Sequence, residues 1–108
     1  MGLGRDGEVL ATVEVADTAH RRAKGLLGRD GFEGAILLRP ARSVHTIGMR
    51  FPIDVAFLDG DLVVLGMVSM RKGRVGRPRL RARAVLEAES GAFARWNLKV
   101  GEQLELKG

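Results

Sequence analysis

The 108-residue chain has no cysteine, no tyrosine and only three prolines. Without cysteine it has no disulfide framework, no thiolate ligands for zinc and no cysteine nucleophile. It also has no apolar run near the roughly 20 residues that span a bilayer, so we expect no transmembrane segment. The first residues contain no apolar signal region, so we expect a cytoplasmic location for the chain as it stands.

The composition that remains is that of an ordinary globular protein. Hydrophobic residues make up 45% of the chain and charged residues 29%. A chain of this length can bury a core of its own, so we expect a single domain. The glycine-rich residues 1–7 are expected to be a flexible N-terminus, and residues 8–108 are expected to form the domain.

The net charge of +5 comes from one short segment, residues 71–83, which we call the basic segment. It has no acidic residue, whereas the rest of the chain has eleven basic and thirteen acidic residues. A nearly neutral domain with one cationic segment differs from a uniformly basic nucleic-acid-binding protein. The basic residues of the segment are Arg71, Lys72, Arg74, Arg77, Arg79, Arg81 and Arg83.

Four arginines of the basic segment alternate with apolar residues between Arg77 and Arg83. On a strand, this spacing would place all four guanidinium groups on one face, where they would repel one another. Two interpretations stay open: a solvated face paired with neighbouring carboxylates, or a surface that binds an acidic protein or an anionic surface. No aromatic side chain lies among these arginines for base stacking, so sequence-specific binding of nucleic acid is not expected.

Short runs of alternating apolar and polar residues predict mostly strands. The clearest turn is Asp59-Gly60-Asp61, which lies between apolar flanks and predicts a hairpin. Extended segments are expected at residues 8–15, 35–38, 44–49, 54–58, 62–70, 80–88 and 104–106.

Two short helical segments complete the pattern, at residues 19–24 and 90–96. Thr18 or Asp17 can cap the first helix and Ser90 the second, while Gly25 and Asn97 are candidates for the left-handed residues that end them. The predicted fold is therefore mainly β, a single-domain β-sandwich or jelly-roll-like barrel with one or two short helices.

Several motifs together resemble one known family. The segment His45–Asp59 contains the most specific of them, His-Thr-Ile-Gly-Met-Arg-Phe-Pro-Ile-Asp-Val, and the others are Ala-x-Thr at 16–18, Arg22 with Gly25-Leu26-Leu27 and Arg29, Val85-Leu86-Glu87, Gly91 and Val100-Gly101-Glu102. Over residues 9–106 the chain resembles the DUF192 family, a small prokaryotic β-rich domain of unknown function. The resemblance implies a compact sandwich close to a jelly-roll and no established activity. Relatives often follow an export signal, and many have lysine and asparagine where this chain has Ile47 and Gly48.

The densest group of polar residues lies around the turn at 45–54. Its candidate ligand-binding residues are His45, Thr46, Met49, Arg50 and Asp54. In the functional interpretation, His45 exchanges hydrogen bonds with a ligand and Arg50 holds an anion. In the structural interpretation, Asp54 accepts hydrogen bonds from turn amides and Arg50 pairs with a carboxylate.

Two more arginines are candidates for the same site. Arg22 and Arg29 would join it if the fold brings the Arg-x-x-Gly-Leu-Leu segment alongside the turn.

The function that these residues favour is a non-enzymatic binding or accessory module with an anion- or ligand-binding turn. The chain has two histidines, no Gly-x-Ser-x-Gly elbow and no P-loop, so we expect no metal and no cofactor. One alternative is a small hydrolase or metal-dependent enzyme that uses His45 and Asp54. The other is an electrostatic adaptor that binds through the basic segment.

Overall fold

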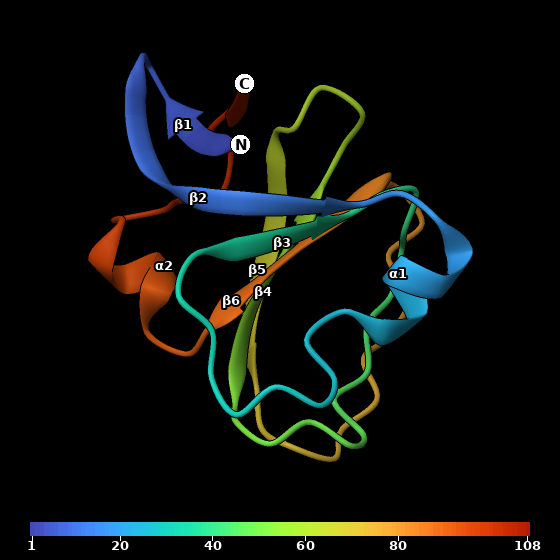
Figure 1. Cartoon of the computed structure of the whole chain (residues 1–108). Coiled ribbons are helices and arrows are strands. Elements are labelled where there is room, and N and C mark those ends of the chain that lie inside the picture. The colour runs from blue at the N-terminus through green and yellow to red at the C-terminus, as the bar shows by residue number, and fades with distance from the viewer.

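The computed structural model describes residues 1–108 and contains seven strands and two short helices (Figure 1). No helix is both long and apolar enough to cross a membrane. In chain order the elements are β1 (Gly2–Arg5), β2 (Glu8–Ala16), α1 (Ala19–Lys24), β3 (Ala35–Leu38), β4 (Ile53–Leu58), β5 (Val64–Met70), β6 (Ala84–Glu89), α2 (Ala92–Arg95) and β7 (Glu105–Lys107).

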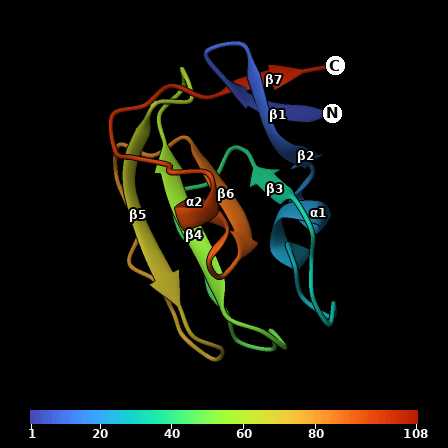
Figure 2. The ribbon, with the colours of Figure 1, turned by 90° about the vertical axis from the view of Figure 1, so that its left-hand side faces the viewer.

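All seven strands belong to one hydrogen-bonded series in the order β5-β4-β6-β3-β2-β1-β7. Neighbouring strands are antiparallel except β2 and β3, which run parallel. An isolated bridge between Val63 and Gln103 links the segment before β5 to the segment before β7. Both termini lie side by side at one end of the molecule (Figure 2).

The mainly β class and the two short helices predicted from the sequence are confirmed. Short apolar runs near turn residues predicted the central strands β3, β4 and β6, which are buried on both faces. A layered sandwich or jelly-roll form stays a prediction, since the hydrogen bonds describe a single series of strands.

Both faces of the central strands are buried. On β4, Val55 and Phe57 pack into one core of 13 buried residues, whereas Ala56 and Leu58 pack into another of 14. We call the first the α1 face, because Leu26 just after α1 packs there, and the second the α2 face, because it contains Ala92 and Phe93 of α2. The two helices lie on opposite sides of the sheet (Figure 1).

The N-terminus differs from the flexible segment expected at residues 1–7. Gly2–Arg5 form β1, which pairs with both β2 and β7, and Leu3 is only 1% exposed. Arg5 also forms an ion pair with Glu102 at 3.1 Å. Partners that come from the far end of the chain hold this segment, and its short glycine-rich pattern gives no sign of them.

The pattern also failed where strands are irregular. Strand β2 contains a bulge opposite Leu3 and Gly4, and Val9, which alternation along residues 8–15 would place on the same face as buried Val13, is 64% exposed. A bulge adds one residue to a strand and so reverses which side chains face the core. Residues 44–49 and 80–83, predicted to be extended, are loops, and β6 begins only at Ala84.

The predicted hairpin joins β4 to β5. The Asp59 carboxylate accepts hydrogen bonds from the Asp61 and Val63 amides at 2.8 and 3.0 Å. The left-handed residue of this turn is Leu62, with φ 66°, and not Gly60.

Helix α1 has the predicted ends. The Thr18 hydroxyl accepts a hydrogen bond from the Arg21 amide, and Gly25 has a φ of 47° and donates its amide to the Arg21 carbonyl. Because Gly25 has positive φ, a side chain there would strain the backbone.

Helix α2 is capped from outside its own sequence. Its N-cap residue, Gly91, has no side chain, and Ser90 makes no cap bond. Instead, Asp54 Oδ2 on β4 accepts hydrogen bonds from the Gly91 and Phe93 amides at 3.0 and 3.1 Å, and Oδ1 accepts one from Ser69 Oγ at 3.0 Å. Asp54 thus satisfies amides at the start of a helix that lack partners within it.

We predict that Asp54→Ala lowers the free energy of unfolding by about 3 kcal/mol, because two amides and a hydroxyl lose their acceptor. Urea denaturation of the variant and the parent measures the change. Asp61→Ala removes an exposed aspartate and serves as the control. A loss below about 1 kcal/mol in the Asp54 variant, or an equal loss in the control, contradicts this role.

Candidate functional site

The predicted turn at 45–54 does not form a single site. Thr46 is fully buried, and its hydroxyl donates a hydrogen bond to the Arg71 carbonyl and accepts one from the Arg74 amide at 2.8 Å. These bonds hold the start of the basic segment in place. Thr46 therefore has a structural role that accounts for its burial.

Met49 and Arg50, which follow Thr46 in the turn, lie in different surroundings: one is buried in the core and the other is exposed. Met49 is buried in the core of the α1 face. Arg50 forms an exposed ion pair with Asp30 at 2.7 Å. This agrees with the structural interpretation of Arg50, and exposed pairs of this kind contribute little to stability.

His45 and Asp54 lie on opposite faces of the sheet. Asp54 shares the α2 face with Ala56, and its oxygens are taken by the amides of α2 and by Ser69. His45 is exposed and lines a cavity on the α1 face. The structure does not bring together the pair required by the alternative of a small hydrolase or metal-dependent enzyme.

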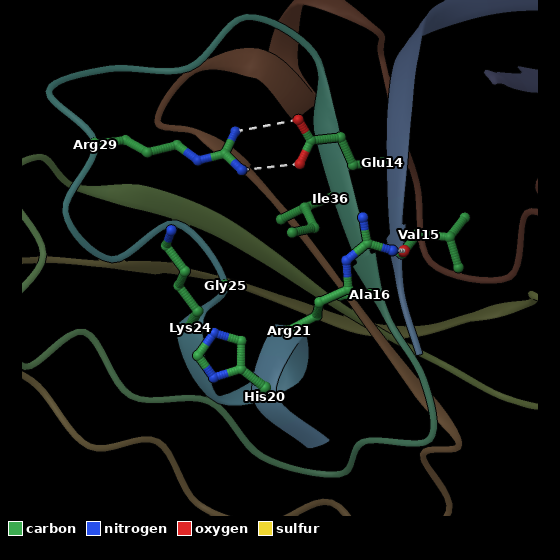
Figure 3. A pocket seen from close by; sticks show the side chains of 9 residues that line it. All are labelled: Glu14, Val15, Ala16, His20, Arg21, Lys24, Gly25, Arg29 and Ile36. Carbon is green, nitrogen blue, oxygen red and sulfur yellow. Dashed lines mark hydrogen bonds and ion pairs between the residues drawn. The ribbon is translucent and has the colours of Figure 1, made fainter. Parts of the chain in front are cut away.

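A larger pocket lies beside α1, and we call it the α1 pocket (Figure 3). Its volume is about 630 Å³. Helix α1 supplies basic side chains from one side, and the loop after it supplies Arg29 from the other. The lining residues are Glu14, Val15, Ala16, His20, Arg21, Lys24, Gly25, Arg29 and Ile36.

One ion pair uses the only carboxylate of the α1 pocket. Arg29 donates two hydrogen bonds to Glu14, at 2.8 and 3.3 Å (Figure 3). Its guanidinium also lies 4.7 Å from the centre of the Phe32 ring. The hydrogen bonds from Arg29 lower the pKa of Glu14, against a smaller effect of burial. The negative charge of Glu14 is thereby balanced by Arg29 within the pocket.

The other basic groups of the α1 pocket form no ion pair, although the charge of Arg21 also lowers the pKa of Glu14. Lys24 and His20 are exposed and form no ion pair. Arg21 reaches only the Val15 carbonyl, at 3.5 Å. The pocket therefore has an excess of positive charge that is available to a ligand.

A second, smaller cavity on the α1 face has a volume of about 90 Å³. We call it the Glu87 cavity, because Glu87 is its only acidic lining residue. It shares Lys24 and Gly25 with the α1 pocket. Its lining consists of residues 22–27 and 43–45 together with Leu38, Met49 and Glu87.

Glu87 lies at the middle of β6 among apolar side chains. It is 4% exposed, and its partners on the adjacent strands are Ile36 of β3 and Val55 of β4. Gly25 packs directly over it, since a Cβ on that residue would lie 3.0 Å from Glu87 Oε1. Burial raises the pKa of Glu87 to about 7, and a backbone hydrogen bond from Leu26 opposes this rise.

No functional role was predicted for Glu87 from the sequence, where it is named only within the Val85-Leu86-Glu87 motif of the family resemblance. A signal was present in the sequence, because a glutamate is an unusual residue inside an apolar run such as 84–88. With period two, Glu87 shares a face with Val85, which is fully buried. The alternation therefore indicated a buried carboxyl.

The two arginines proposed as additions to the site lie in different places. Arg22 lines the Glu87 cavity together with His45 and Met49, whereas Arg29 lines the α1 pocket. Arg22 also donates a hydrogen bond to the Asp17 carbonyl at 2.9 Å. The Arg-x-x-Gly-Leu-Leu segment therefore does lie beside part of the 45–54 turn.

The basic segment is a loop between β5 and β6, so its arginines are not on one face of a strand as the alternation suggested. All seven basic residues are exposed, and none forms an ion pair. Arg79 lies over the Phe57 ring at 4.6 Å. Two large apolar residues in the segment, Val75 and Leu80, are 73% and 80% exposed.

Comparison with known proteins connects the chain to uncharacterised relatives. The DUF192 family model, described as "Uncharacterized ACR", matches residues 3–106. The UPF0127 protein of Pyrococcus abyssi is 30% identical over 98 residues, which are 86% of this chain and 84% of that protein. The UPF0127 protein of Pyrococcus furiosus is 29% identical over 91% of this chain and 89% of its own length.

A solved structure has a similar fold. The crystal structure of a protein of unknown function from Novosphingobium aromaticivorans aligns with a TM-score of 0.74 at 25% identity. The alignment covers 87% of this chain and 74% of that protein.

Proposed function

The chain belongs to the uncharacterised DUF192 family, and we propose that it is a non-enzymatic binding module. Its α1 pocket holds a small anion. The observation that carries this proposal is the excess of unpaired basic groups in the pocket. Arg29 is held by Glu14, whereas Lys24, His20 and Arg21 form no ion pair.

The shape of the α1 pocket fits a small ligand. Its volume of about 630 Å³ is within the range of roughly 300–1,000 Å³ that is usual for small-molecule sites. Ile36 and Val15 supply apolar surface to its wall (Figure 3). A phosphate or carboxylate group would accept charge-assisted hydrogen bonds from Lys24 and Arg21.

The same lining argues for binding without catalysis. The pocket contains no serine, threonine or cysteine that would act as a nucleophile. Its only carboxylate, Glu14, is ionised and engaged by Arg29, so it is poorly suited to act as a general base.

We predict that inorganic phosphate binds the parent protein and that Lys24→Gln weakens this binding about tenfold, because a charge-assisted hydrogen bond is lost. Amide chemical shifts of residues 14–24, followed by NMR during a phosphate titration at low ionic strength, measure the affinity. Low salt is needed because exposed charges are screened.

Lys99→Gln is the matched control for this titration, since Lys99 is also exposed and lies outside the pocket. It should bind phosphate as the parent does. Shifts that are spread over the whole surface, or equal effects of the two substitutions, contradict an anion site beside α1.

A second candidate function is supported by the basic segment. Its seven cations have no acidic partners, and exposed Val75 and Leu80 lie among them. Cationic and apolar side chains together fit the surface of an anionic membrane, where lysine and arginine are attracted and apolar side chains are buried. In this function the protein is an electrostatic adaptor.

For the adaptor function we predict that the chain sediments with vesicles that contain phosphatidylserine and not with vesicles of phosphatidylcholine alone. The double substitution Arg77→Gln and Arg81→Gln should weaken binding by roughly thirtyfold, at about 1 kcal/mol for each basic residue. Arg95→Gln with Lys99→Gln removes the same charge elsewhere and is the control. Binding that is insensitive to salt, or equal losses in both double variants, contradicts the adaptor.

A further inference from the structure

Glu87 is the buried polar side chain with the fewest partners within the protein, namely one backbone hydrogen bond from Leu26. Three polar or charged residues are buried: Thr46, Asp54 and Glu87. Thr46 and Asp54 accept or donate several hydrogen bonds that hold a loop and a helix. Glu87 forms no ion pair and no hydrogen bond to another side chain.

An ionised carboxylate in such surroundings is costly unless a cation or hydrogen-bond donors compensate it. The neighbours of Glu87 on β3 and β4 are apolar, and Gly25 covers it with backbone alone. Three basic residues, Arg22, Lys24 and His45, also line the cavity. None of them forms an ion pair with Glu87.

We propose that the Glu87 cavity binds a small zwitterion of the amino-acid type, with its ammonium group on the Glu87 carboxylate and its carboxylate toward Arg22, Lys24 and His45. This site adjoins the anion site in the α1 pocket and shares Lys24 with it, whereas its ammonium-binding group, Glu87, lies outside that pocket.

The arrangement of charges favours a zwitterion over a simple ion. A cation alone would be repelled by the three basic lining residues, and an anion alone would be repelled by ionised Glu87. A ligand whose ammonium and carboxylate groups are joined through one carbon atom can pair with Glu87 at one end and with the basic residues at the other. The volume of about 90 Å³ is near that of three waters at roughly 30 Å³ each, so the ligand is of about the size of glycine.

Binding is coupled to a proton. The ammonium group pairs only with the ionised form of Glu87. At a pH at which the Glu87 carboxyl is protonated, binding therefore releases that proton. The groups that face it are uncharged on β3 and β4, and the basic lining residues come from α1 and from the loop at 43–45. The affinity for glycine should therefore rise as the pH increases from 5 to 8.

Isothermal titration of the full chain with glycine tests the proposal. The parent should bind glycine, and Glu87→Gln, which keeps the shape of the side chain, should weaken binding at least tenfold. Glu89→Gln, on the same strand and partly exposed, should leave the affinity unchanged. At pH 6 the parent should release nearly one proton per glycine, measured from the heat in buffers of different ionisation enthalpy.

Sodium acetate and methylammonium chloride separate the possible ligands. Both should bind at least tenfold more weakly than glycine. His45→Gln, a change at an exposed residue that leaves the core intact, should weaken glycine binding about threefold. The proposal is overturned if the parent does not bind glycine, if Glu87→Gln binds it as the parent does, or if acetate binds equally well.

Discussion

Burial of both faces of β4 and β6 is the constraint on which the rest of the structure depends. Strands in the middle of the sheet contribute alternate side chains to two separate cores, so a polar residue at any position on them is enclosed. Enclosed polar groups must find partners or remain costly. Asp54 meets this requirement by capping α2, whereas Glu87 faces a small cavity. One strand pair thus contains a structural carboxylate on one face and, on the other, a carboxyl that is held by one backbone hydrogen bond and forms no ion pair.

Both candidate binding sites lie on the α1 face, because α1 and the residues after it line both of them. Helix α1 and the residues that follow it supply basic side chains to the α1 pocket and the backbone roof of the Glu87 cavity. Lys24 and Gly25 line both spaces. The absence of a side chain at Gly25 lets the backbone approach the Glu87 carboxyl, so the turn that ends α1 also shapes the cavity.

The sequence predicted the fold better than the site, for physical reasons. Short apolar runs near turn residues indicated β3, β4 and β6, and cap residues indicated α1, because these signals are local. The bulge in β2 and the pairing of β1 with β7 depend on distant residues and left no local trace. The site hypothesis grouped His45 with Asp54 by their closeness in sequence, but His45 lies in a loop on the α1 face, whereas the side chain of Asp54 on β4 faces α2. Arg22 was expected beside His45 only if the fold brought the two segments together, and both residues line the Glu87 cavity.

The central claim is that Glu87 is buried without a compensating charge, and the pH dependence of stability tests it most directly. Its pKa is about 7 in the folded protein and near 4.5 when unfolded. Since the folded value is higher, the parent is most stable relative to Glu87→Gln below pH 4.5 and loses this advantage as the pH rises to 7. Urea denaturation from pH 4 to 8 should show the difference in unfolding free energy changing by about 3 kcal/mol in favour of the variant. A difference that is constant with pH, or that changes in favour of the parent, would contradict the account.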